Sequence, residues 1–275
     1  MRIVVLSWLL VMLSCTAQAA EPSLTVTVGG ETRNFTREAL LARSDAAIIQ
    51  VPMDISYRTP MTYRAVPVAA LLAGMNIPPD SVIEAVAVDG FTAQLPLDLV
   101  LNTDESKAVA WLAIEEPDHP WPKLREKDVS AGPFYIVWTG ADVGSIRSEQ
   151  WPFQMATLES QPSPASRWPA LAVDPSLPAT DPIRAGQALF VVQCLTCHKL
   201  NKAGAADVGP DLNLPQNPTE YLSPKGLHDL IRNPKAVRTW PAQVMPPFPP
   251  DYLSDREIDL VIAYLKHMAG RKVAE

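Results

Sequence analysis

The sequence predicts two domains, an α+β domain over residues 20–160 and an all-α domain over residues 182–275, joined by a proline-rich linker over residues 161–181. In the first half apolar and polar residues alternate with the period of strands, and in the second half apolar residues recur with the period of helices. A length of 275 residues with 47% apolar composition is enough for two buried cores. The formal net charge of −7 argues against nucleic-acid or anionic-lipid ligands, because like charges repel.

The N-terminus has the pattern of a secretory signal peptide. A basic residue, an apolar run over residues 3–13 and small residues before the expected cleavage site predict that residues 1–19 are removed on export to the periplasm. A run of this length, at about 1.5 Å per residue, is too short for a bilayer core of about 30 Å, which disfavours a retained anchor. We do not expect a lipid on Cys15, because Leu13 lies one place too close to it for a lipoprotein signal. No later stretch is long and apolar enough to predict a membrane span.

Alternating residues in the first half predict strands and one hairpin. Residues 82–88 and 91–95 flank Asp89-Gly90, a dipeptide typical of tight hairpin turns. The other predicted strands cover residues 24–28, 109–114, 134–138 and 151–158, and two short helices cover residues 36–43 and 67–75. The expected class of this domain is therefore α+β.

Prolines mark the boundary between the two halves. Six of the 28 prolines lie between residues 161 and 182 without a periodic apolar pattern, which predicts a semi-stiff, extended linker. The charge changes at the same place, because residues 21–160 contain 10 basic and 19 acidic side chains whereas residues 161–275 contain 12 and 11. The acidic charge of the protein therefore belongs to the first domain.

Three helices are predicted in the second half. The first covers residues 182–193, and the second covers residues 224–232 behind a serine that can cap it. The last helix follows Ser254, which forms a capping box with Glu257. Apolar residues then recur at helical spacing along it.

One motif in the second half carries specific chemistry. Without the signal peptide, the only cysteines are Cys194 and Cys197, and His198 follows directly. This Cys-x-x-Cys-His pattern is the attachment sequence of c-type haem, in which two thiols bond the porphyrin and the histidine is an axial ligand of the iron. The alternatives are a thioredoxin-like redox pair, for which the surrounding βαβ pattern is missing, and half of a zinc site, for which a second ligand pair is missing.

Residues 181–270 resemble class I monohaem cytochrome c. Gly186 and Phe190 match the residues at which the first helix of that family crosses the last, here at Tyr264. The segment Gly209-Pro210-Asp211-Leu212 is similar to the loop whose proline carbonyl accepts a hydrogen bond from the proximal histidine. The resemblance therefore implies one covalent haem c and a supporting role for Pro210.

The resemblance also implies the sixth ligand of the iron. Met245-Pro246-Pro247-Phe248 matches the distal methionine loop of the family, so Met245 is the expected ligand beside His198. The alternative is that Met245 only fills a gap in the core. Other candidate ligands are Met268, His228 and His267 on predicted helices, and His119 in a loop of the first domain.

Residues 24–160 resemble, more loosely, the molybdopterin-binding fold of sulfite-oxidase-like proteins. The similarity lies in residues 35–41, 63–72, 88–91, 95–96 and 132–134. That family binds molybdenum through a cysteine thiolate, and this domain contains no cysteine. We therefore expect a cofactor-free relative, without molybdopterin, that docks a partner or shapes the haem surface. The charge runs 115–118 and 125–128 are expected to be solvated loops.

Together these features predict a periplasmic electron-transfer protein or cytochrome subunit rather than a stand-alone enzyme. A dehydrogenase or another oxidoreductase would donate single electrons, and a cytochrome or respiratory oxidase would accept them. Two alternatives stay open: a haem enzyme or gas sensor with an open sixth site, and a molybdenum-dependent, sulfite-type oxidoreductase. No catalytic side chain is predicted. Basic residues exceed acidic ones by two near the motif and could steer an acidic partner: Lys199, Lys202, Lys225, Arg232, Lys235 and Arg238 against Asp207, Asp211, Glu220 and Asp229.

Overall fold

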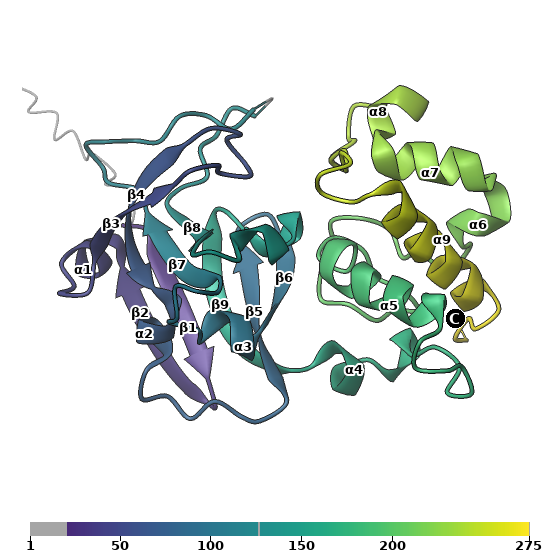
Figure 1. Cartoon of the computed structure of the whole chain (residues 1–275), viewed down its shortest axis with the longest axis horizontal. Coiled ribbons are helices and arrows are strands. Elements are labelled where there is room, and N and C mark those ends of the chain that lie inside the picture. The colour runs from purple at the N-terminus through teal and green to yellow at the C-terminus, as the bar shows by residue number, and fades with distance from the viewer. Residues whose placement is uncertain (1–20, 126, 275) are drawn as a thin grey trace, which may run out of the picture.

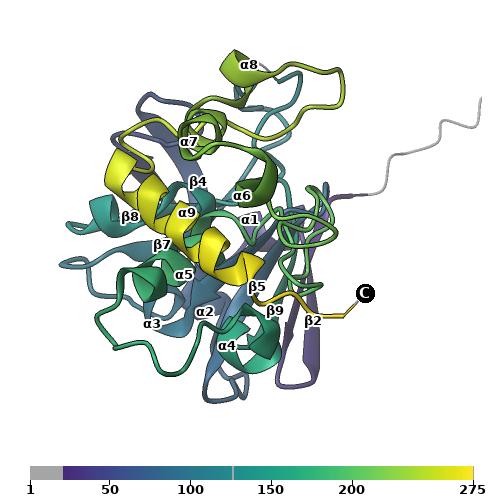
Figure 2. The same ribbon diagram turned by 90° about the vertical axis from the view of Figure 1, so that its right-hand side faces the viewer.

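The computed structural model describes residues 21–125 and 127–274 of the chain. Two β-sheets form the N-terminal domain, and helices form the C-terminal domain beside it (Figure 1). In the view of Figure 2 the helices face the viewer and the sheets lie behind them. The predicted signal peptide and Cys15 lie outside the described residues.

The N-terminal domain contains a five-stranded and a four-stranded sheet. The larger sheet has the order β2-β1-β9-β5-β6, with strands Glu31–Thr36, Ser23–Val28, Met155–Pro162, Ser81–Ala87 and Thr92–Pro96. The smaller has the order β3-β4-β7-β8, with strands Ala47–Val51, Met61–Pro67, Val109–Ile114 and Phe134–Thr139. Neighbouring strands are antiparallel except for the parallel pair β1 and β9.

The strand patterns of the sequence explain the core of this domain. Leu24, Val26 and Val28 alternate along β1 and are completely buried, as a strand with one face on the core requires. The predicted hairpin is confirmed, because β5 and β6 pair antiparallel across Asp89-Gly90, and Gly90 has the positive φ of +88° that the turn requires.

The helical part of this domain is smaller than predicted. Helices α1 (Arg37–Leu41), α2 (Val68–Leu72) and α3 (Leu97–Val100) have four or five residues each. The helix expected over 67–75 ends at Leu72, because Ala73 is extended and Gly74 adopts a φ of +74°. The domain is therefore built mainly from two sheets, and the sulfite-oxidase-like fold stays a prediction.

The segment over 161–181 is more ordered than the extended linker that the prolines indicated. It contains the end of β9, helix α4 (Pro164–Arg167) and a 3₁₀ turn at Pro169–Leu171. Leu171 and Val173 are buried in the core of the C-terminal domain. The prolines begin short helices here, and the apolar residues between them attach the segment to that core.

In the C-terminal domain, helices α5 (Pro182–Gln193) and α9 (Asp255–Ala269) pack against each other. The other helices are α6 (Pro218–Tyr221), α7 (Pro224–Arg232) and α8 (Pro234–Val237). Ser254 and Glu257 form the predicted capping box of α9. A Cβ at Gly186 would lie 2.0 Å from the carbonyl oxygen of Leu260, so only glycine permits the close approach of the two helices. Nearby, the rings of Phe190 and Tyr264 have their centres 5.3 Å apart.

Candidate haem site

The end of α5 positions the three residues of the attachment motif. The N–H of Cys194 donates to the carbonyl of Phe190 at 2.9 Å, and the N–H of His198 donates to the carbonyl of Cys194 at 2.9 Å. The intervening Leu195 and Thr196 are buried, whereas the two cysteines and His198 are half-buried. The spacer residues therefore anchor the turn in the core and leave the reactive side chains at its surface.

The ring of His198 is held by the loop that follows it. Its Nδ1–H donates to the carbonyl oxygen of Pro210 at 2.8 Å. Donation from Nδ1 to a carbonyl leaves Nε2 unprotonated, which is the form that can bind a metal. Burial lowers the pKa of His198, which favours the neutral imidazole that binds metals. A Cβ at Gly209 would lie 2.5 Å from Cε1 of this ring, so glycine is required beside it.

Both cysteines lack a disulfide and have the properties of thiols rather than thiolates. Burial, and then the neighbouring Glu149 carboxylate, raise the pKa of Cys194 and Cys197 to about 12. Among the residues that the structure describes, no group of three or more histidine, cysteine, aspartate or glutamate side chains is placed to hold a metal ion.

The N-terminal domain covers one side of the attachment turn. The N–H of Thr92 donates to the carbonyl of Thr196 at 3.0 Å, and the N–H of Glu149 donates to the side-chain oxygen of Gln193 at 3.4 Å. Burial raises the pKa of Glu149 to about 7. These contacts fix the turn relative to the two sheets.

Met245 lies in the irregular segment before α9. We call residues 245–252 the methionine segment. Met245 is half-buried and packs against the same apolar core as Cys194. Arg232 of α7 holds the segment by donating to the carbonyl of Phe248, whose side chain is buried.

The other candidate ligands have partners elsewhere. His267 accepts a hydrogen bond from the N–H of Asp174 at 3.1 Å, and His228 lies 3.2 Å from the Asp255 carboxylate. Met268 is buried in the core on α9. His119 is exposed in the N-terminal domain, in the loop that follows β7. Of these side chains, Met245 is the one in an irregular segment of the C-terminal domain rather than on a helix or in the other domain.

The residues fit a covalent haem. Two thiols and a histidine fixed through Nδ1 are the groups that covalent attachment of haem c requires. Among the described residues, the amide nitrogen and oxygen of the Gln243 side chain are both buried without a hydrogen-bond partner. Buried polar atoms are rarely left unpaired in native proteins, so this amide beside the methionine segment is suited to a polar group of the cofactor.

Sequence reasoning did not identify a network of polar residues that shapes the loop after His198. The Asp211 carboxylate accepts the N–H groups of Lys202, at 2.6 Å, and Asn213, at 2.8 Å. The amide of Asn213 donates to Asn201 and to the carbonyl of Met268, each at 2.8 Å. The available signal was three asparagines after the motif, Asn201, Asn213 and Asn217, but their partners include carbonyls of α9 that the local sequence does not reveal.

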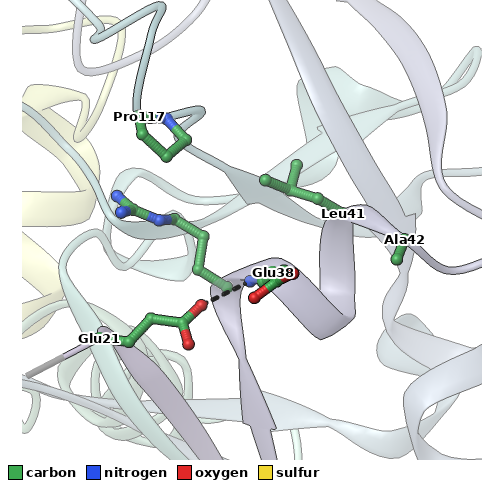
Figure 3. Close-up of a pocket in the computed structure, with 6 residues that line it drawn as sticks. Glu21, Glu38, Leu41, Ala42 and Pro117 are labelled. Atoms are coloured by element: carbon green, nitrogen blue, oxygen red, sulfur yellow. Dashed lines mark hydrogen bonds between the residues drawn. The ribbon is translucent and has the colours of Figure 1, made fainter.

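A separate hollow of about 630 Å³ lies in the N-terminal domain (Figure 3). Leu41 and Pro117 line it together with Arg37, and the Glu21 carboxylate beside them accepts the N–H of Glu38 at 2.9 Å. None of its lining residues belongs to the C-terminal domain. In the nearby charge run, residues 116–118 are exposed as predicted, whereas Glu115 is half-buried and its carboxylate accepts bonds from the N–H of Trp121 and the Ser130 hydroxyl, each at 2.8 Å.

The attachment motif, the histidine fixed through Nδ1 and the α5–α9 crossing are features typical of a haem-binding cytochrome domain. Residues 181–265 match the family described as cytochrome c oxidase, cbb3-type, subunit III. This part of the chain is therefore a cytochrome c domain, which implies covalent haem c and haem-based electron transfer with redox partners. No curated protein matches the chain. Within the described residues, none of the helices is long and apolar enough to cross a membrane.

Proposed function

We propose that this protein carries single electrons in the periplasm between an oxidoreductase and a respiratory acceptor, through one haem c attached to Cys194 and Cys197. The proposed axial ligands are His198 and Met245. The observation that carries the proposal is the 2.8 Å bond from His198 Nδ1 to Pro210, beside two unpaired thiols. That bond serves a metal ligand, since it orients the ring and strengthens Nε2 as a donor.

The side chains have separate roles in this proposal. The cysteine thiols would hold the cofactor covalently, and the bound iron would supply one-electron redox chemistry. The neutral imidazole of His198 and the soft thioether of Met245 would be retained in both oxidation states. A thioether favours the reduced iron relative to a second imidazole, so the ligand pair suits a high-potential carrier.

The surface near the site indicates how a redox partner would be bound. Lys199 pairs with Asp207, and Lys225 pairs with Asp229 at 2.5 Å, so the basic excess expected from the sequence is partly neutralised. Paired surface charges contribute little to association. Apolar side chains are exposed at the end of α8 and along the chain from there to Met245: Val237, Trp240 and Val244. A partner would therefore bind through apolar contact as well as charge.

The N-terminal domain is proposed to serve the cytochrome domain rather than to bind a molybdenum cofactor. Molybdenum binding in the family that it resembles requires a cysteine thiolate, and residues 20–160 contain none. Docking to the attachment turn through Thr92 and Glu149 supports a role in shaping the haem surface.

Absorption spectroscopy of the full-length protein with haem attached tests the proposal. We expect a low-spin spectrum in both oxidation states, and no change when carbon monoxide is added to the reduced protein, because both axial positions are filled. Met245→Ala should bind carbon monoxide. The matched control is Met53→Ala, at an exposed methionine of the N-terminal domain, and it should behave as wild type.

A wild-type ferrous spectrum that shifts on adding carbon monoxide would contradict the proposal. The sixth site would then be open or labile, and the haem enzyme or gas sensor would become the better interpretation. Molybdenum found in protein purified from its native host would favour the sulfite-type oxidoreductase instead.

A further inference from the structure

The N-terminal domain contacts the cytochrome domain at the methionine segment as well as at the attachment turn. Tyr252, seven residues after Met245, donates its hydroxyl to the carbonyl of Ile55 at 2.6 Å. The guanidinium carbon of Arg58 lies 4.1 Å from the centre of the Tyr252 ring, and Arg58 also pairs with Asp251 at 2.6 Å. Both N-terminal residues belong to the loop between β3 and β4. This loop therefore binds the end of the methionine segment through a hydrogen bond, a ring contact and an ion pair.

The loop between β3 and β4 is organised around a buried carboxylate. Asp54 is fully buried and accepts the N–H groups of Ser56 and Tyr57, each at 2.9 Å. The same carboxylate accepts the hydroxyls of Tyr63, at 2.8 Å, and Tyr135, at 3.2 Å, which belong to β4 and β8. The backbone on either side of Asp54 is thus tied to the small sheet, so the loop presents a rigid surface to Tyr252.

Within the cytochrome domain, the methionine segment and Leu253, which follows it, are held from two other directions. Arg232 donates to the carbonyl of Leu253 at 2.7 Å, in addition to its bond to Phe248. The carbonyl of Tyr252 accepts the side-chain amide of Gln193 at 3.3 Å, next to the first haem cysteine. The methionine segment therefore lies between α7, the attachment turn and the N-terminal loop, and only the last of these belongs to the other domain.

We infer that Arg58 and Tyr252 are positioning residues through which the N-terminal domain keeps Met245 over the haem iron. The inference rests on the proposed His198 and Met245 ligation. If the segment opened far enough to move Tyr252, the bond to Ile55 and the stack on Arg58 would break. These contacts stabilise the closed state alone and shift the equilibrium toward the methionine-bound form. The hydroxyl bond and the ring contact contribute most, because the Asp251 side chain is 59% exposed and exposed ion pairs are weak.

Competition by imidazole for the ferric iron tests this inference in the full-length, haem-bearing protein. Imidazole binds only when Met245 has left, so its affinity reports the opening of the segment. Tyr252→Phe and Arg58→Ala should each raise this affinity about threefold to tenfold, which is the factor given by one hydrogen bond of ordinary strength. The long-wavelength absorption band that a sulfur ligand gives ferric haem should weaken in parallel.

Two controls make the test specific. Arg147 forms an ion pair of similar geometry with Glu257, at 2.7 Å, which joins the two domains at α9 rather than at the methionine segment. Arg147→Ala should therefore keep the imidazole affinity of wild type. In a Met245→Ala background, Tyr252→Phe should have no further effect, because the ligand that it positions is gone.

Each outcome has a distinct meaning. If Met245→Ala changes neither the band nor the imidazole affinity, both the ligation proposal and the positioning inference are overturned. If Met245→Ala abolishes the band while Tyr252→Phe and Arg58→Ala match wild type, only the positioning inference is overturned. An equal rise in the imidazole affinity of Arg147→Ala would also overturn the positioning inference, because any loosening of the contact between the two domains would then be enough to release Met245.

Discussion

Gly209, in the loop after the attachment motif, lies against the imidazole ring of His198 and fixes the space that the ring occupies. In the structure a Cβ at this position would lie 2.5 Å from Cε1, 2.6 Å from Nδ1 and 3.0 Å from Nε2 of that ring. Gly209 does not have a left-handed backbone, so alanine brings no conformational strain there, and the whole effect of Gly209→Ala is steric.

The size of the effect follows from these distances. The imidazole must move by about 1 Å to reach ordinary van der Waals separation from a methyl group. Such a shift would stretch or break its 2.8 Å bond to Pro210. Overpacking typically costs about 1–3 kcal/mol and a lost hydrogen bond about 1 kcal/mol, so we expect the free energy of unfolding to fall by about 2–4 kcal/mol.

Guanidinium unfolding of the full-length, haem-bearing protein, followed by haem absorbance, measures this loss. The matched control is Gly144→Ala in the N-terminal domain, where a Cβ meets nothing within 4 Å, and its change should stay below about 0.5 kcal/mol. If Gly209→Ala unfolds at the same guanidinium concentration as wild type, with an unaltered spectrum, the placement of His198 against Gly209 is wrong.

Three further predictions concern the packing and charge of the two domains. Gly186→Ala should destabilise the cytochrome domain by about 2–4 kcal/mol in guanidinium unfolding, because the added Cβ clashes with the Leu260 carbonyl. This cost outweighs the gain of about 1 kcal/mol in helix propensity. A variant more stable than wild type would refute the close crossing of α5 and α9. Asn213→Ala should cost about 2–3 kcal/mol in the same assay, because it removes three buried hydrogen bonds of that amide, to Asn201, to Asn217 and to the Met268 carbonyl, at about 1 kcal/mol each. A loss below about 0.5 kcal/mol, the size of a surface change, would count against the network. Burial raises the pKa of Asp54, so the native state binds its proton more tightly than the unfolded state, and the free energy of unfolding should fall as the pH rises above about 4. Asp54→Asn should reduce that slope in urea unfolding across this pH range and leave the part due to Glu149, whose pKa burial raises to about 7. A slope equal to that of wild type would assign it to groups other than Asp54.

Elements whose ends depend on neighbouring residues could be predicted from the sequence. Helix α9 begins at its capping box, and α5 begins behind Asp181 with proline in its first turn, as the local signals indicate. The β5–β6 hairpin likewise forms around Asp89-Gly90. In each case the interacting atoms lie within a few residues of one another, so a short window of sequence contains the whole interaction.

Other features depend on residues that are far apart in the chain. The linker was expected to be extended because prolines remove helical periodicity, yet Leu171 packs into the C-terminal core and its carbonyl accepts the Tyr264 hydroxyl at 2.7 Å. Asn213 could equally have been an exposed loop residue, and only the path of α9 provides its partners. Tyr252 carries no local signal at all, since its hydroxyl partner, Ile55, lies 197 positions away.

Contacts between the domains also determine which parts of the cytochrome domain a redox partner can reach. The attachment turn is covered where Thr92 bonds to Thr196, and the covering domain carries 10 basic and 19 acidic side chains. An acidic partner that approached along this side would be repelled by the N-terminal domain, whatever the charge of the cytochrome domain itself. The surface of Trp240 and Val244, which is exposed beside Met245, carries no such cover. Electron exchange with an acidic partner is therefore expected on the side of Met245. On that side the loop between β3 and β4, through its contacts with Tyr252, would also affect how strongly Met245 binds the iron.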